Sequence, residues 1–244
     1  MTALKRSSDR KTANSVTASG NVRGKNGFAL PSGREFSCPG ATDFCNKICY
    51  AGKLERLFPG FRDVVQHNWN EVKDADFDTL VTLINDMIVE FVAECDKINA
   101  KGNLASYDFR IHIDGDFFSR EYAEAWAKVI SDFPQVRFWA YTRTFDIVDV
   151  LAGLDNLNLY VSADPDNMAD AAEVAGNFDN VKIATVADTF AEAREMMFDD
   201  SRKAYNCPEI GKRIPLISPK GSACISCGIC PAARGDVAFS VSGK

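Results

Sequence analysis

Three cysteines near the end of the chain have the spacing of a metal-binding loop. Cys224, Cys227 and Cys230 are each separated by two residues, and a proline follows the last of them. This spacing lets three sulfurs converge on one centre while the intervening backbone N–H groups point at it, as in ferredoxin cluster loops. Cys207 is the natural fourth ligand. The pattern predicts an iron–sulfur cluster. Structural zinc is the competing interpretation, although zinc sites usually combine two short cysteine pairs.

A second cysteine set lies near the start of the chain, after the first predicted strand. It has no obvious fourth ligand, so it can bind three irons of a [4Fe–4S] cluster and leave the last iron open to an exogenous ligand. Alternatively, loops from the two ends of the chain meet around one cluster, and the remaining thiols are structural or bind zinc. The sequence therefore predicts one or two [4Fe–4S] clusters. The candidate metal ligands are Cys38, Cys45, Cys49, Cys207, Cys224, Cys227 and Cys230.

The eighth cysteine has a different expected role. Cys95 lies on the apolar stripe of a predicted helix over Phe77–Ile98, where a small thiol packs in the core like an apolar side chain. A reducing cytosol disfavours structural disulfides. The clustered cysteines are therefore assigned to metal binding or redox chemistry.

No segment of the sequence indicates a membrane or a secretory route. The first residues lack the apolar stretch of a signal peptide, and no later stretch approaches the roughly 18 uninterrupted apolar residues of a membrane span. We therefore expect a soluble, cytoplasmic protein without a membrane partner.

Charge is distributed unevenly along the chain. Residues 1–26 carry six Lys or Arg and one acid, whereas residues 27–244 carry 22 basic and 33 acidic side chains. The acidic body would repel a polyanion, so a nucleic-acid partner is disfavoured. The sequence predicts a basic, flexible tail over residues 1–26 and a single domain over residues 27–244.

Apolar periodicity switches between strand and helix many times. This alternation predicts an α/β fold with parallel strands, arranged as a TIM-barrel-like full or partial (β/α) barrel, with an open sheet as the alternative. Ser119 and Thr144 are expected to cap helices. The predicted strands span Gly27–Pro31, Tyr107–Ile113, Val136–Thr142, Leu157–Ser162, Val181–Val186, Ile214–Ile217 and Val237–Val241. The predicted helices span Phe61–Val72, Phe77–Ile98, Arg120–Ser131, Phe145–Ala152, Asn167–Ala175 and Thr189–Phe198.

Polar residues follow three successive predicted strands, at 114–116, 141–144 and 162–166. Because ligands gather at the carboxyl ends of parallel strands, we expect one shared functional mouth there. Asp114, Asp116 and Arg143 are the candidate catalytic residues, and a surface ion pair with a helix acid is the alternative for Arg143. The candidate cofactor-binding residues are His112 and Thr142.

Several of these motifs together resemble the phage gene-product-88 family. They are Ser37-Cys38-Pro39-Gly40 with Cys45 and Cys49-Tyr50-Ala51-Gly52, then His112-Ile113-Asp114-Gly115-Asp116-Phe117, Trp139-Ala140-Tyr141-Thr142-Arg143, and the closing cysteine loop. The resemblance covers residues 27–244 and implies a phage protein that works in the host cytoplasm. It implies no particular activity.

The chain is also distantly similar to radical S-adenosylmethionine enzymes. Those enzymes place a three-cysteine loop after the first strand of a partial barrel and a glycine–acid motif after the second strand. Cys38, Cys45 and Cys49 and the segment Asp114-Gly115-Asp116 occupy analogous positions. The cysteine spacing differs, being six then three residues here and three then two in that superfamily. The similarity implies S-adenosylmethionine as a candidate ligand.

Two classes of function follow from these patterns. The first is an enzyme in which an open-iron cluster activates a small molecule that the strand-end residues orient. The second is a non-catalytic cluster protein that carries electrons, senses, or binds a host protein. A structural zinc protein is the third alternative.

Overall fold

The computed structural model describes residues 2–7, 9–16, 22–197, 202–218 and 221–244. Its centre is a seven-stranded sheet in which every neighbouring pair of strands is parallel. The strands lie in the order β3-β5-β6-β7-β8-β12-β9. Their bounds are Gly27–Ala29 for β3, Asp108–Asp114 for β5, Arg137–Thr142 for β6, Leu157–Ala163 for β7, Lys182–Ala187 for β8, Ala204–Asn206 for β9 and Asp236–Ser240 for β12.

The predicted α/β class and the parallel sheet are confirmed. The predicted barrel is not observed as a closed one, because over the described residues the edge strands β3 and β9 do not pair with each other. Strands β3, β5, β6, β7 and β8 lie side by side in chain order, as short helical crossovers require. Because these strands are parallel, their carboxyl ends lie along one edge of the sheet, where the following loops can meet.

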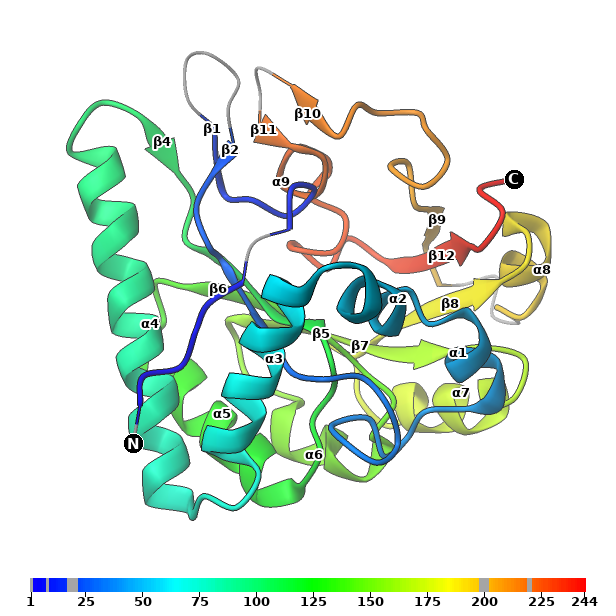
Figure 1. The fold of residues 1–244 in the computed structure, drawn as a ribbon. Helices are drawn as coiled ribbons and strands as arrows, with labels where there is room; N and C mark the ends of the chain where they lie inside the picture. The colour runs from blue at the N-terminus through cyan, green and yellow to red at the C-terminus, as the bar shows by residue number, and fades with distance from the viewer. Residues whose placement is uncertain (1, 8, 17–21, 198–201, 219–220) are drawn as a thin grey trace.

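The helices that connect these strands cover one face of the sheet (Figure 1). Their apolar sides form the main core, with Trp126, Phe91 and Phe109 fully buried. Ser119 caps α5 as predicted, since its hydroxyl accepts from the N–H of Tyr122. The bounds are Phe77–Asn99 for α4, Arg120–Asp132 for α5, Phe145–Ile147 for a 3₁₀ turn, Val148–Leu151 for α6, Met168–Gly176 for α7 and Phe190–Glu195 for α8.

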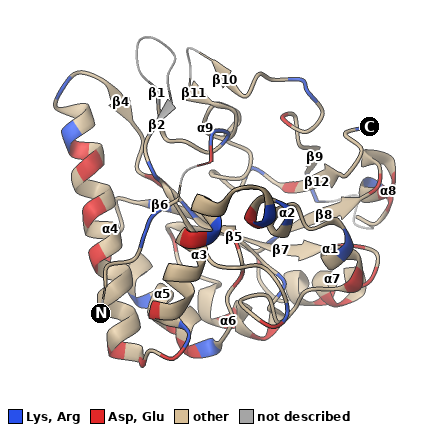
Figure 2. Ribbon diagram, viewed as in Figure 1, with Lys and Arg blue, Asp and Glu red and all other residues tan. Residues whose placement is uncertain are grey.

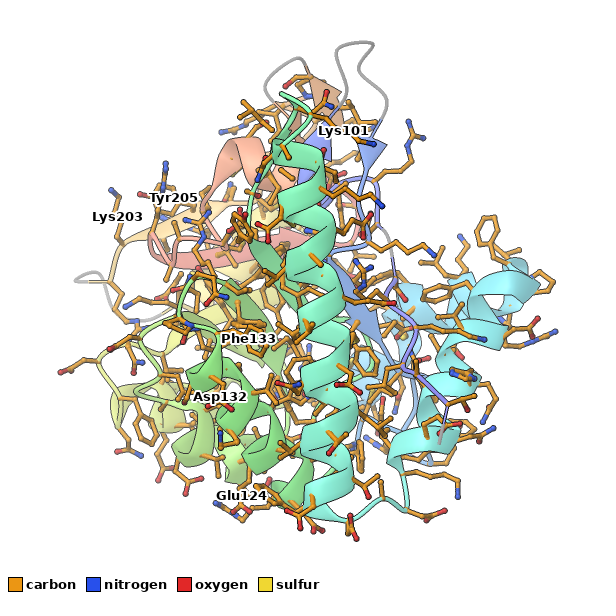
Figure 3. All side chains as sticks on the ribbon, turned by 90° about the vertical axis from the view of Figure 1, so that its left-hand side faces the viewer. Lys101, Glu124, Asp132, Phe133, Lys203 and Tyr205 are labelled. Carbon is orange, nitrogen blue, oxygen red and sulfur yellow. The ribbon has the colours of Figure 1, made fainter. Side chains whose placement is uncertain are left out.

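Charged side chains mark the outer sides of these helices. Figure 2 shows acidic residues along α4, and Glu124 and Asp132 on α5 are exposed (Figure 3). Over the described residues, no helix combines the length and the apolar character needed to cross a membrane.

The opposite face of the sheet is covered by the two ends of the chain. Tyr160 is buried there beside Val237, and Tyr141, Cys207 and Cys230 pack against them. Figure 1 shows α9 on the side of the sheet away from α5 and α7. The small elements on this side are β1 (Ser15–Val16), β2 (Val22–Arg23), β4 (Leu104–Ala105), β10 (Ile217–Ser218), β11 (Gly221–Ser222) and α9 (Ala223–Cys227).

Three helices separate β3 from α4. They are α1 (Asp43–Ile48), α2 (Tyr50–Leu57) and α3 (Pro59–Val72), and α3 confirms the helix predicted over Phe61–Val72. Cys45 lies in α1 and Cys49 lies between α1 and α2, although this segment was expected as a loop. The two helices form because Thr42 and Cys49 each supply a cap to the helix that follows.

Two predictions about local structure are wrong. The strand expected over Ile214–Ile217 is reduced to the two-residue pairing of β10 with β11 outside the main sheet. The segment 1–26, expected as a flexible tail, is packed on the domain wherever the structure describes it before residue 17. Leu4 joins the main core, and Asn14 is buried with its amide bonded to the carbonyl oxygen of Ser106. Buried apolar and hydrogen-bonded side chains hold this segment despite its basic composition.

Candidate metal centres

The N-terminal cysteine site comprises Cys38, Cys45 and Cys49, which follow β3. Local hydrogen bonds fix each of them. The N–H of Cys38 donates to the carbonyl oxygen of Gly33 at 3.0 Å, and the N–H of Cys45 donates to Oγ1 of Thr42 at 2.9 Å. Cys49 caps α2, and its sulfur accepts from a backbone N–H at 3.4 Å.

The end of β7 holds this site from across the sheet. Oδ2 of Asp164 accepts from the hydroxyl of Thr42 at 2.5 Å, and Oδ2 of Asp166 accepts from the N–H of Phe44 at 2.8 Å. The guanidinium of Arg143 lies 2.6 Å from the same Asp164 oxygen, and Asp164 is fully buried. Arg143 thus pairs with Asp164 and not with a surface helix acid.

A glycine permits the close approach of these two segments. A Cβ atom on Gly40 would lie 2.1 Å from the carbonyl oxygen of Arg143, which is backbone and cannot rotate away. The cysteine segment therefore rests directly on the loop after β6. Any larger residue at this position would push the cysteines away from the strand ends.

The strand-end residues predicted to be functional do gather beside this site. Oδ2 of Asp116 accepts from the N–H of Arg143 at 2.7 Å, and its Oδ1 accepts from the N–H of Phe117 at 2.7 Å. The hydroxyl oxygen of Thr142 accepts from the N–H of Thr144 at 3.0 Å. These groups tie the end of β5 to the end of β6, so their observed contacts are with the protein itself.

In the described part of the chain, one buried oxygen of Asp114 lacks a close hydrogen-bond partner, and the carboxyl group of Glu55 lies near it. Oδ1 accepts from the N–H of Gly115, whereas the buried Oδ2 has no hydrogen-bond partner among the described residues. Burial raises the pKa of Asp114 to about 8, and the nearby carboxylate of Glu55 acts in the same direction. Burial also raises the pKa of Asp116 to about 6. The Asp114 carboxyl is therefore largely protonated at neutral pH.

Carboxyl groups dominate the electrostatics of the N-terminal site. Burial raises the pKa of the Cys38 thiol, and the charge of Asp116 raises it further. Burial also raises the pKa of Cys45, and only Arg143 among the nearby charges opposes that effect. Because Arg143 is already paired with Asp164, this site has little positive charge to spare for thiolates.

The C-terminal cysteine site comprises Cys207, Cys224, Cys227 and Cys230. Cys207 follows β9, and its N–H donates to the carbonyl oxygen of Ala238 at 2.9 Å, which places it beside β12. It packs with Cys230 against the ring of Tyr160. Cys207 thus shares a hydrophobic cluster with one cysteine of the triplet.

Positive charge faces this second site. Burial raises the pKa of Cys224 to about 12, and Arg110 and Lys11 counteract that rise. Burial also raises the pKa of Cys230 to about 12, and the hydrogen bond from Tyr141 counteracts it. Since burial raises the pKa of Tyr141 well above its usual value, its hydroxyl stays protonated and remains a donor.

The two classes of cysteine differ in exposure. Cys95 is buried, with 1% of its surface accessible, as predicted for a core residue. All seven cysteines of the two sites keep intermediate exposure. Across the described part of the chain, no three His, Cys, Asp or Glu side chains are arranged to hold a metal ion. The types of donor nevertheless suit a thiolate-bound group, because Cys207 and Cys230 pack in one cluster with Tyr141 and the charges of Arg110 and Lys11 act on Cys224.

His112 lies apart from both cysteine sites. Its ring packs edge-on against Phe117 with centroids 4.9 Å apart, and its Nε2 lies 2.9 Å from the hydroxyl of Tyr122. Burial lowers the pKa of His112 to about 3, so the ring is neutral. This placement gives His112 an aromatic environment in the core and not the expected position at the mouth.

Sequence reasoning missed three residues that shape these sites. Arg110 interrupts the buried strand β5, and a charged residue within an apolar run was the available signal. Asp164 stood in a recognised polar turn, but its contact with Thr42 spans 122 positions. Lys11 was assigned to the tail.

The fold is that of an α/β protein with a parallel sheet and two groups of cysteines, one near the carboxyl ends of the strands and one on the face of the sheet. The model of the family described as gene product 88 matches residues 2–233. The gene 88 proteins of Mycobacterium phage D29 and Mycobacterium phage L5 are each 47% identical to this chain over 251 and 250 positions, with both chains fully covered. No solved structure matches it. This chain belongs to the gene product 88 family, which is the family that its motifs indicated.

Proposed function

We propose that this protein binds a [4Fe–4S] cluster at Cys207, Cys224, Cys227 and Cys230. The observation that carries the proposal is that Cys207 and Cys230, which come from separate segments, pack against the same buried cluster around Tyr160. Four thiols from two separate segments suit a closed cluster, in which every iron has a protein ligand. Structural zinc would use the same thiols and is the alternative.

The surroundings of the C-terminal site favour an anionic group. A cluster ligated by four thiolates carries net negative charge, and nearby cations stabilise such charge. Lys11 and Arg110 both lie close enough to lower the pKa of Cys224. The phenol of Tyr141 supplies a hydrogen bond to Cys230, as donors to cluster sulfurs do elsewhere.

Anaerobic purification tests the proposal directly. We expect a brown protein that absorbs near 400 nm and contains iron and acid-labile sulfide in equal amounts. Cys227→Ser should remove this absorbance, whereas Cys95→Ser should keep it. A colourless protein that contains zinc and no sulfide would exclude the cluster.

The candidate catalytic function depends on a second cluster, bound by Cys38, Cys45 and Cys49, in which one iron has no protein ligand. The observation in its favour is that Asp114, whose buried Oδ2 lacks a hydrogen-bond partner among the described residues, lies near Cys38. There the last iron would accept a small molecule, for which S-adenosylmethionine is one candidate. For either function, we propose that the parallel sheet forms a partial (β/α) barrel and that the protein works in the host cytoplasm. A change in the EPR spectrum of the reduced protein on adding S-adenosylmethionine would support the open iron, and no change in fully loaded protein would favour a non-catalytic cluster protein.

A further inference from the structure

Lys11 connects the two cysteine sites. Its carbonyl oxygen accepts from the N–H of Cys224 at 2.8 Å, and its ammonium lies 5.5 Å from the centre of the Tyr50 ring. Tyr50 directly follows Cys49 and begins α2. One residue of the N-terminal segment therefore contacts the backbone of one site and the aromatic neighbour of the other.

Arg110 approaches the same region from the sheet. Its guanidinium lies 5.3 Å from the centre of the Tyr141 ring, and its Nε donates to the carbonyl oxygen of His112 at 3.0 Å. Tyr141 packs in the same cluster as Cys207 and Cys230. Two cations thus lie against tyrosine rings, one beside each cysteine site.

Within the described part of the chain, only Lys11 of the two cations has a carboxylate partner, and that contact is long. Among the described residues Arg110 forms no ion pair, and the nearest carboxylate to Lys11 is Asp9 at 4.0 Å. Half-buried arginines elsewhere are paired directly, as Arg202 is with Asp236 at 2.7 Å. A partly buried positive charge without a carboxylate partner needs another anion nearby.

We propose that Lys11 and Arg110 are redox-tuning residues that stabilise the reduced cluster at the C-terminal cysteine site and link it electrostatically to the N-terminal site. The inference rests on the proposed cluster. Reduction adds one electron from a low-potential donor, and no bond forms or breaks. The charges of Lys11 and Arg110 both act on Cys224, so their removal should disfavour the negative charge that reduction adds.

Anaerobic redox titration with dithionite, followed by EPR, tests this inference. In Arg110→Met and in Lys11→Met we expect the equilibrium constant for reduction of the C-terminal cluster to fall at least about tenfold, which is about 59 mV for one electron. Arg110→Lys keeps the charge and should stay within about threefold of the wild type.

A matched control removes a similar cation from another place. Lys203 lies 5.2 Å from the centre of the Tyr205 ring, near the outer edge of the sheet (Figure 3). Lys203→Met should leave the equilibrium constant unchanged. An equal shift in this control would mean that net charge alone sets the potential, and would overturn the assignment.

The other possible results of the redox titration also test the inference. Unchanged potentials in both methionine variants, with the cluster intact, would overturn the inference and leave the proposed function standing. Absence of iron and sulfide from the wild type would instead overturn the proposed function. Should Arg110→Met fail to fold, Lys11→Met decides alone, because Lys11 keeps 28% of its side chain exposed and its loss disturbs little packing.

Discussion

The two cysteine sites lie in opposite electrostatic environments. The N-terminal site is surrounded by the carboxyl groups of Asp114, Asp116 and Asp164, and its nearby cation, Arg143, is already paired. The C-terminal site faces Arg110, which forms no ion pair among the described residues, and Lys11, whose carboxylate partner Asp9 lies 4.0 Å away. Burial opposes thiolate charge at both sites, but nearby cations counteract it at the C-terminal site, whereas carboxyl groups add to it at the N-terminal one. The comparison indicates that the C-terminal site is the better place for a permanently bound anionic cluster.

The largest expected effect comes from removing a ligand of the C-terminal site. Because binding free energy at such a site is also folding free energy, Cys227→Ser should release the metal and lower the free energy of unfolding by more than about 5 kcal/mol. Cys95→Ser should retain the metal and cost about 1 to 3 kcal/mol for the buried hydroxyl. Metal analysis and thermal unfolding measure both, and equal metal loss would contradict the division of the cysteines.

The next effect concerns the ion pair that holds the N-terminal site. Asp164→Ala leaves Arg143 without its partner, with only 10% of the Arg143 side chain exposed, and should cost about 3 to 5 kcal/mol in unfolding by urea. The exposed pair of Arg120 with Asp149 is the matched control, and Asp149→Ala should cost less than about 1 kcal/mol. A similar cost for the two variants would refute a special role for Asp164.

A smaller effect is expected from a substitution that disturbs the N-terminal site alone. Gly40→Ala drives a Cβ into the backbone of Arg143 and should cost about 1 to 3 kcal/mol, with metal lost from the N-terminal site only. Gly60→Ala is its control, since a Cβ there meets nothing within 4 Å and alanine favours the helix by about 1 kcal/mol. Loss of the C-terminal metal in Gly40→Ala would show that the sites form one unit.

The smallest effect is a pH dependence at the N-terminal site. The folded-state pKa of Asp114, about 8, lies above the ordinary value of 3.8, so its contribution to stability is full below pH 4 and is lost as the pH rises through 8. In metal-free protein, Asp114→Asn should therefore gain at least about 1 kcal/mol relative to the wild type between pH 5 and pH 9. The prediction would be contradicted if thermal unfolding showed the same stability difference between Asp114→Asn and the wild type at pH 5 and at pH 9.

Much of the scaffold was predictable from the sequence because its signals are local. The apolar runs of β5 to β8 and the stripe of α4 gave the parallel sheet and its helices, and Ser119 marked the start of α5. Strand β9 was missed because its three residues are only partly buried and show no alternation.

The electrostatics of the sites were not predictable, because they depend on contacts between distant segments. Asp164 meets Thr42 across 122 positions, and Lys11 meets Cys224 from the other end of the chain. Asp116 and Thr142 were expected to serve a ligand, yet their observed hydrogen bonds go to backbone N–H groups of neighbouring loops. A motif gives the donor atoms, whereas tertiary contacts decide which of them remain free.

The most direct measurement of the central claim is the iron and acid-labile sulfide content of anaerobically purified wild-type protein beside Cys227→Ser. The account predicts iron and sulfide in equal amounts, about four of each per chain for a single [4Fe–4S] cluster or about eight for two, and a loss of about four of each in the variant. Zinc without sulfide in the wild type, or an unchanged iron content in Cys227→Ser, would contradict it.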